Sequence, residues 1–88
     1  MKKTLIIAIG FLFISCTVWG QDAMYFFNLG LNSSMTNNKI NYFTKAIEIN
    51  PMLSEAYEKR GILYYFQEKY ADTIHDFQRV IELRPFEP

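Results

Sequence analysis

Two stretches of sequence decide the fold: KINYFTKAIEINP at residues 39–51 and TIHDFQRVIELRP at residues 73–85. When Lys39 is aligned with Thr73, five of the thirteen positions are identical. The identical pairs are Ile40 with Ile74, Phe43 with Phe77, Ile47 with Ile81, Glu48 with Glu82 and Pro51 with Pro85. Self-similarity at a fixed period of roughly 20 to 50 residues is typical of repeat proteins. The sequence therefore predicts two copies of one structural unit.

The second stretch, taken together with the residues from Tyr70 onward, has the pattern of an amphipathic helix. Its apolar residues recur at spacings of four, three and four, on one helical face: Tyr70, Ile74, Phe77 and Ile81. Pro85 ends this helix, because proline lacks the N–H donor and clashes with the preceding turn. Residues 54–66 form a second proline-free segment with Glu55 in its first turn, and the polar residues 67–69 connect the two. We expect two antiparallel helices joined by a tight turn.

Residues 54–85 resemble a tetratricopeptide repeat. The pattern Tyr57-x2-Arg60-Gly61-x2-Tyr64, then Thr73-x3-Phe77, then Pro85, is similar to the family's aromatic, Leu-Gly, Tyr, Ala, Phe and Pro signature. The offset between the two stretches also equals the family's period of about 34 residues. The resemblance implies that these residues pack the repeat: Tyr57, Gly61, Tyr64, Thr73, Phe77 and Pro85.

Two residues of this pattern carry further expectations. Gly61 costs a helix about 1 kcal/mol relative to Ala, so we expect it to permit close helix contact. Arg60 replaces the family's Leu. We expect its stem to lie on the packed face with its charge in water.

An earlier, shortened copy precedes this repeat. Phe26-x2-Leu29-Gly30 resembles the same signature, but the spacing from Gly30 to Phe43 is three residues shorter than that from Gly61 to Phe77. We expect the first helix to end near Ser33, with residues 36–38 supplying a turn and the next helix cap. The predicted fold is all-α, with about two antiparallel helix-turn-helix repeats, at residues 21–53 and 54–88, forming a short α-solenoid fragment.

Residues 1–20 have the layout of a bacterial secretory signal. A charged start, Met1-Lys2-Lys3, precedes an apolar run that is short for a membrane span, and a small residue, Gly20, follows. We expect cleavage after Gly20 and an exported, periplasmic or envelope-associated product. Residues 13–16 weakly resemble a lipoprotein box, so acylation of Cys16 stays open, as does an uncleaved anchor. Only these two alternatives place the chain at a membrane.

Composition argues against several functions. The chain has nine basic and nine acidic side chains, and Lys2 and Lys3 belong to the leader, so the remainder is mildly acidic and unsuited to nucleic acid. Asp72, His75 and Asp76 could form a metal site, but we expect a solvated helix face there, as for all acidic residues of this region. No nucleophile with a base and no phosphate loop is apparent, so we expect neither catalysis nor a cofactor.

The family resemblance implies a peptide-binding groove lined by the first helix of each repeat. Carried onto this sequence, its residues are Glu55, Glu58, Ile62, Tyr65 and Phe66. Walls of apolar and acidic character favour an apolar or basic peptide. Alternatively, Tyr65 and Phe66 pack against the preceding repeat or a second copy.

The function expected from this resemblance is protein–protein interaction, as an adaptor or scaffold. No capping helix follows the last repeat signature, so we expect a face including Val80 and Leu83 to be covered by a second copy, a partner or further sequence. The alternative is a docking or sensory front part of a longer envelope-associated signalling protein or enzyme.

Overall fold

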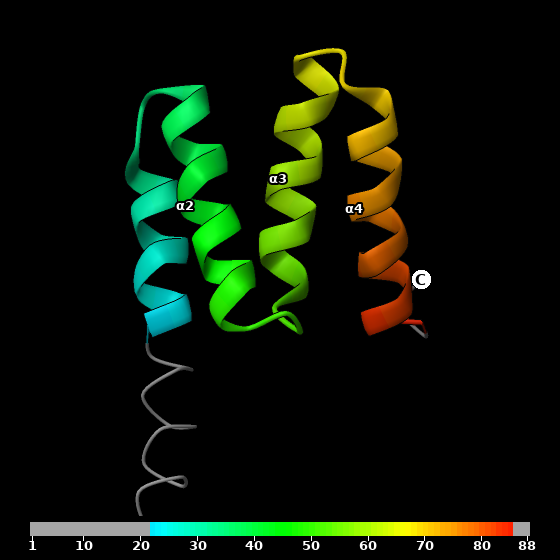
Figure 1. Ribbon diagram of the computed structural model, residues 1–88, viewed down its shortest axis with the longest axis horizontal. Coiled ribbons are helices and arrows are strands. Elements are labelled where there is room, and N and C mark those ends of the chain that lie inside the picture. Colours follow the sequence, from blue (N-terminus) through cyan, green and yellow to red (C-terminus); the bar gives the residue numbers. More distant parts are fainter. Residues whose placement is uncertain (1–21, 86–88) are drawn as a thin grey trace, which may run out of the picture.

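The computed structural model describes residues 22–85, which form four helices and, within that range, no strand (Figure 1). A helical segment, 22–32, is followed by α2 (Thr36–Ile49), α3 (Ser54–Phe66) and α4 (Tyr70–Leu83). The all-α prediction of antiparallel helix-turn-helix repeats is confirmed. The expected leader at residues 1–20, with Cys16 and Gly20, lies outside the described residues. None of the helices between residues 22 and 85 has the length and apolar character needed to cross a membrane.

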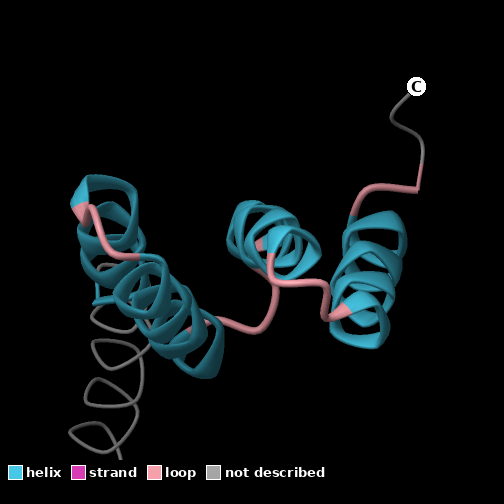
Figure 2. Ribbon diagram, turned by 90° about the horizontal axis from the view of Figure 1, so that it is seen from above, coloured by secondary structure: helices cyan, strands magenta, loops and turns pink. Residues whose placement is uncertain are grey.

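The helices alternate in direction and stand side by side in chain order (Figures 1 and 2). Helix 22–32 and α2 form the first hairpin, and α3 and α4 form the second. Helix α3 packs against both α2 and α4. It therefore joins the two repeats.

The apolar core lies where α3 meets the first hairpin. Its buried members are Phe27, Phe43, Ala46 and Ala56. The rings of Phe27 and Phe43 are 5.5 Å apart, and the small side chains of Ala46 and Ala56 leave room for α3 to approach. Leu53 and Leu63 of the second hairpin pack against this cluster, as do Phe26 and Ile47 of the first. Burial of these side chains stabilises the contact between the repeats.

Both helical glycines sit beneath a phenylalanine ring of the following helix. A Cβ added to Gly30 would lie 2.6 Å from Cε1 of Phe43, and one added to Gly61 would lie 3.2 Å from Cε1 of Phe77. Ordinary carbon contacts are longer than either distance. Gly30 and Phe43 are thus the counterparts of Gly61 and Phe77, in the register that shortens the first copy by three residues.

The connections between helices use local backbone bonds. Glu68 has a left-handed backbone with φ of 62°. Around it, the N–H of Glu68 donates to the carbonyl of Tyr65 and that of Lys69 donates to the carbonyl of Tyr64, both at 2.9 Å. This is the hydrogen-bond pattern of a Schellman turn, where glycine is usual.

At the start of α2 the expected cap is wrong. Met35 is the capping position and no side chain caps the helix. The amide of Asn37 instead accepts a hydrogen bond from Gln67. Asn37, in the first turn of α2, therefore contacts the second hairpin rather than capping its own helix.

Candidate protein-binding site

A buried ion pair joins α3 and α4 next to the apolar core. Nε and Nη2 of Arg60 donate to Oδ2 and Oδ1 of Asp76 at 2.9 and 2.7 Å. The side chain of Asp76 is 1% exposed and that of Arg60 is 13% exposed. The expectations that Asp76 lies on a solvated face and that Arg60 keeps its charge in water are therefore wrong. The attraction between the two charges compensates for the free-energy cost of removing each of them from water.

Arg60 also connects three helices. Its Nη1 donates to Oγ1 of Thr44 on α2 at 3.2 Å. Its guanidinium carbon lies 5.7 Å from the ring centre of Tyr57 and 5.6 Å from that of Tyr64, within cation–π range. The hydrogen bond to Asp76 is the largest cause that raises the pKa of the Arg60 guanidinium, against the opposing effect of burial. This side chain holds α3 in a defined position against both neighbours.

The other residues expected to pack the repeat differ in their surroundings. Tyr57, Gly61 and Thr73 are buried, and Oγ1 of Thr73 lies 3.2 Å from the carbonyl oxygen of Gly61, to which it donates. Tyr64 is half-buried, whereas Pro85 is exposed. Phe77 contacts Gly61 along one edge while 36% of its surface stays exposed. The contact between α3 and α4 is therefore made by small and polar side chains, and the partly exposed ring of Phe77 covers it.

The residues considered for a metal site do not form a group of three. Nδ1 of His75 lies 3.6 Å from Oδ1 of Asp76, but the Asp76 carboxylate is bonded to Arg60, and Asp72 is exposed. In the part of the chain that the structure describes, no three His, Cys, Asp or Glu side chains are grouped as metal ligands would be.

A hollow of about 290 Å³ opens between the end of helix 22–32, α2 and α3. Its lining consists of Leu31, Lys39, Phe43, Lys59, Ile62 and Leu63. Nζ of Lys39 donates to the carbonyls of Gly30 and Leu31 at 3.0 and 3.1 Å, so it closes the end of helix 22–32. Lys59 is exposed and makes no ion pair with another residue of the range 22–85. The hollow thus has an apolar floor and a free cation at its rim.

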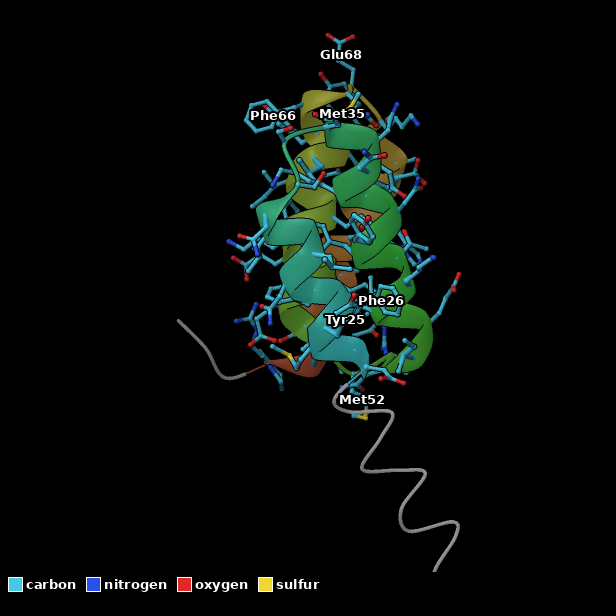
Figure 3. All side chains as sticks on the ribbon, turned by 90° about the vertical axis from the view of Figure 1, so that its left-hand side faces the viewer. Tyr25, Phe26, Met35, Met52, Phe66 and Glu68 are labelled. Carbon is cyan, nitrogen blue, oxygen red and sulfur yellow. The ribbon has the colours of Figure 1, made fainter. Side chains whose placement is uncertain are left out.

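Of the five expected groove residues, the hollow takes in only Ile62. Glu58 is paired with Arg84 at 2.6 Å, and Glu55 is exposed. Tyr65 and Phe66 are exposed and their rings contact each other at 5.8 Å. Figure 3 shows Phe66 standing out from the ribbon at the end that also holds Met35 and Glu68.

The chemistry of the hollow differs from the acidic walls expected from the sequence. Lysines line it, and Glu58 is neutralised by Arg84. Lys59 was not among the groove residues expected from the sequence. It lies four residues after Glu55 and three residues before Ile62, so the three side chains share one helical face. That spacing was the signal that could have found it.

A second exposed apolar surface runs along α4. Its four side chains are Tyr70 at 53%, Ile74 at 58%, Phe77 at 36% and Ile81 at 66% exposed; we call them the α4 stripe. Val80 and Leu83, which we expected on the uncovered face, are half-buried and are less exposed than the stripe.

Comparison with known proteins supports the same architecture. Tetratricopeptide repeat protein 13 of Homo sapiens is 40% identical over 52 residues, which are 59% of this chain. The fold is tetratricopeptide-like. A UDP-N-acetylglucosamine–peptide N-acetylglucosaminyltransferase of Giardia intestinalis is 38% identical over 63 residues, or 68% of this chain. The chain spans only 6% and 4% of the lengths of these two relatives. No family model and no solved structure match the chain.

Tetratricopeptide-like repeats suggest a protein–protein interaction module. The hollow and the α4 stripe are two apolar surfaces through which this chain can make such contacts.

Proposed function

We propose that the chain is the protein-binding module of an exported bacterial protein, with no enzymatic activity of its own, and that it holds a partner segment in the hollow beside α3. The observation that carries this proposal is the apolar floor of Phe43, Ile62 and Leu63 beneath the free ammonium group of Lys59. A volume of about 290 Å³ is at the lower end for ligand pockets, which suits one or two peptide side chains.

The lining specifies the chemistry of the segment. An apolar side chain fits the floor, and a carboxylate next to it in sequence reaches Lys59, whose charge is not neutralised by a described residue. Lys39 cannot replace Lys59 in this role without releasing the carbonyls of Gly30 and Leu31. The favoured ligand is therefore apolar and acidic rather than basic.

Selection from a random peptide library tests this assignment. Peptides enriched on the purified chain should contain a large apolar residue within a few positions of Asp or Glu. Lys59→Glu should weaken the enriched peptides by about fivefold, or about 1 kcal/mol, because it replaces attraction by repulsion at the rim. Lys69→Glu is the matched control, since it makes the same charge change on a lysine that does not line the hollow. Enrichment of basic peptides, or equal losses in both variants, would contradict the proposal.

Export is part of the proposal and rests on residues 1–20. The N-terminus of the product recovered from the producing cell tests it by mass spectrometry. A start at Gln21 supports cleavage after Gly20, and an acylated Cys16 supports a lipid-anchored product instead. A product that retains Met1 and stays inside the cell excludes both.

A second candidate is a docking or sensory part of a longer envelope-associated signalling protein or enzyme. The small fraction of each relative that the chain spans, 6% and 4%, favours it. The mass of the native product decides between the two, because an adaptor of this length and a longer protein differ by far more than the measurement error.

A further inference from the structure

The α4 stripe is the counterpart of a surface that is covered elsewhere in the same molecule. In the alignment of the two repeated stretches, Ile74, Phe77 and Ile81 correspond to Ile40, Phe43 and Ile47 of α2. Phe43 is 2% exposed and Ile47 packs against the buried cluster, because α3 lies over them, antiparallel to α2. The stripe thus has the composition of a surface that an antiparallel helix covers. Among residues 22–85 it is covered only at its edge, where Phe77 contacts Gly61 and the ring of Tyr70 lies 5.7 Å from that of Tyr65.

We propose that a second copy of this chain covers the stripe, with the two α4 helices packed antiparallel about a twofold axis. The order of side chains carries this choice. Aromatic and aliphatic residues alternate along the stripe at spacings of four, three and four, and these spacings read the same in both directions. Reversal therefore sets Tyr70 against Ile81 and Ile74 against Phe77 of the partner, an aromatic ring on an aliphatic side chain in every pair.

The charges near the axis permit this pairing. The midpoint of the stripe falls between His75 and Asp76, and the carboxylate of Asp76 is turned away into its bond with Arg60. Glu82 follows the last residue of the stripe and accepts a hydrogen bond from Arg79. In an antiparallel pair the Glu82 side chains of the two copies lie far apart, at opposite ends of the interface. The described residues thus bring no like charges together at the axis, which is the condition for a self-complementary interface.

A head-to-tail arrangement fits less well. In that arrangement helix 22–32 of a second copy would take the place that α3 holds on α2. On α3 this contact is made by the fully buried Ala56, which lies five residues before Gly61. The residue five positions before Gly30 in helix 22–32 is Tyr25. Tyr25 is 60% exposed and, because of its ring, is too large to approach as closely as Ala56 does. The twofold pair of α4 helices avoids this clash.

The inference goes beyond the proposed function, because no residue of α4 lines the hollow. Its geometry predicts which introduced thiols meet. With a rise of about 1.5 Å per residue, residue 81 of one copy lies level with residue 70 of the other, while the two residues 81 lie about 16 Å apart along the axis. A disulfide needs Cα atoms within about 7 Å.

Cysteine pairing of the purified full chain tests the proposal, with Cys16→Ser in every variant so that only introduced thiols react. Mixed Tyr70→Cys and Ile81→Cys chains should form a disulfide-linked dimer under mild oxidation, and Ile81→Cys alone should form at least tenfold less. Both positions are exposed, so neither change disturbs the core. Sedimentation of the unmodified chain should give twice the monomer mass.

Three results would overturn the pairing. Efficient linking of Ile81→Cys alone indicates parallel helices, and linking of every variant indicates unspecific aggregation. A chain that stays monomeric and forms no disulfide-linked dimer would mean that a different protein or further sequence covers the stripe. None of these three results affects the peptide selection on the hollow, so the pairing of α4 helices can be disproved while the proposed binding by the hollow stands, and the reverse.

Discussion

Arg60 on α3 holds the carboxylate of Asp76 on α4 through two hydrogen bonds, of 2.9 and 2.7 Å, inside the second repeat. The same guanidinium reaches Thr44 on α2 at 3.2 Å. An apolar cluster stabilises the first hairpin and its contact with α3, whereas an ion pair and a threonine hydroxyl lie between α3 and α4. The second repeat therefore depends on polar contacts where the first depends on packing.

Arg60→Met should lower the free energy of unfolding by about 3–5 kcal/mol, because it leaves the buried carboxylate of Asp76 without its cation. The side chain of Asp76 is 1% exposed, so water cannot take the place of the guanidinium. Urea denaturation followed by circular dichroism measures the change.

The double variant Arg60→Met/Asp76→Leu should recover most of this loss, because apolar side chains of similar volume can replace a buried pair. Lys59→Met serves as the control, since Lys59 is next to Arg60 on α3 but is exposed, so its loss should change stability little. If Arg60→Met and Lys59→Met are equally mild, the ion pair does not hold α3 and α4 together.

Gly30→Ala should destabilise the chain more than Gly61→Ala. The new Cβ at residue 30 would lie 2.6 Å from the ring of Phe43, which is 2% exposed and has no space to move. Overpacking costs about 1–3 kcal/mol, more than the gain of about 1 kcal/mol from alanine in a helix. At residue 61 the nearest atoms are Cβ of Asp76 and Cε1 of Phe77, both 3.2 Å away. The partly exposed ring of Phe77 can shift, but Asp76 is held by Arg60, so we expect a smaller loss than at residue 30 rather than a gain. Thermal unfolding of both variants checks the order, and the reverse order would contradict the contact between Gly30 and Phe43.

Glu68→Gly should raise the free energy of unfolding by about 0.5–1 kcal/mol, because glycine adopts a left-handed backbone without strain. The φ of Glu68 is 62°, which a side chain disfavours. Glu68→Ala, measured alongside by urea denaturation, should bring no such gain because alanine shares the strain. A gain in Glu68→Ala equal to that in Glu68→Gly would place the effect in the charge rather than in the backbone.

Much of the fold could be predicted from the sequence. The repeated stretch, Pro85 and the polar residues 67–69 indicate the second hairpin, because periodicity and helix-stop signals are local. The shortened first copy follows from the spacing between Gly30 and Phe43, and the structure has the two in contact.

The buried charges could not be predicted in the same way. Asp76 stands beside His75 and near Asp72, in a stretch whose composition suggests solvent, and its partner lies on another helix. Arg60 stands where the family has an apolar residue, but we expected its charge to stay in water and did not infer a buried acid from it. Helical periodicity also predicted the α4 stripe as one face, but a single helix pattern does not say what lies against it.

The most direct test of protein binding by the hollow is an NMR titration of the chain with a peptide enriched in the library selection. We expect saturable amide shift changes that cluster at Leu31, Lys39, Lys59, Ile62 and Leu63, and no such changes along the α4 stripe. Saturable changes confined to α4, or shifts that stay the same in Lys59→Glu, would show that the hollow beside α3 is not the binding site.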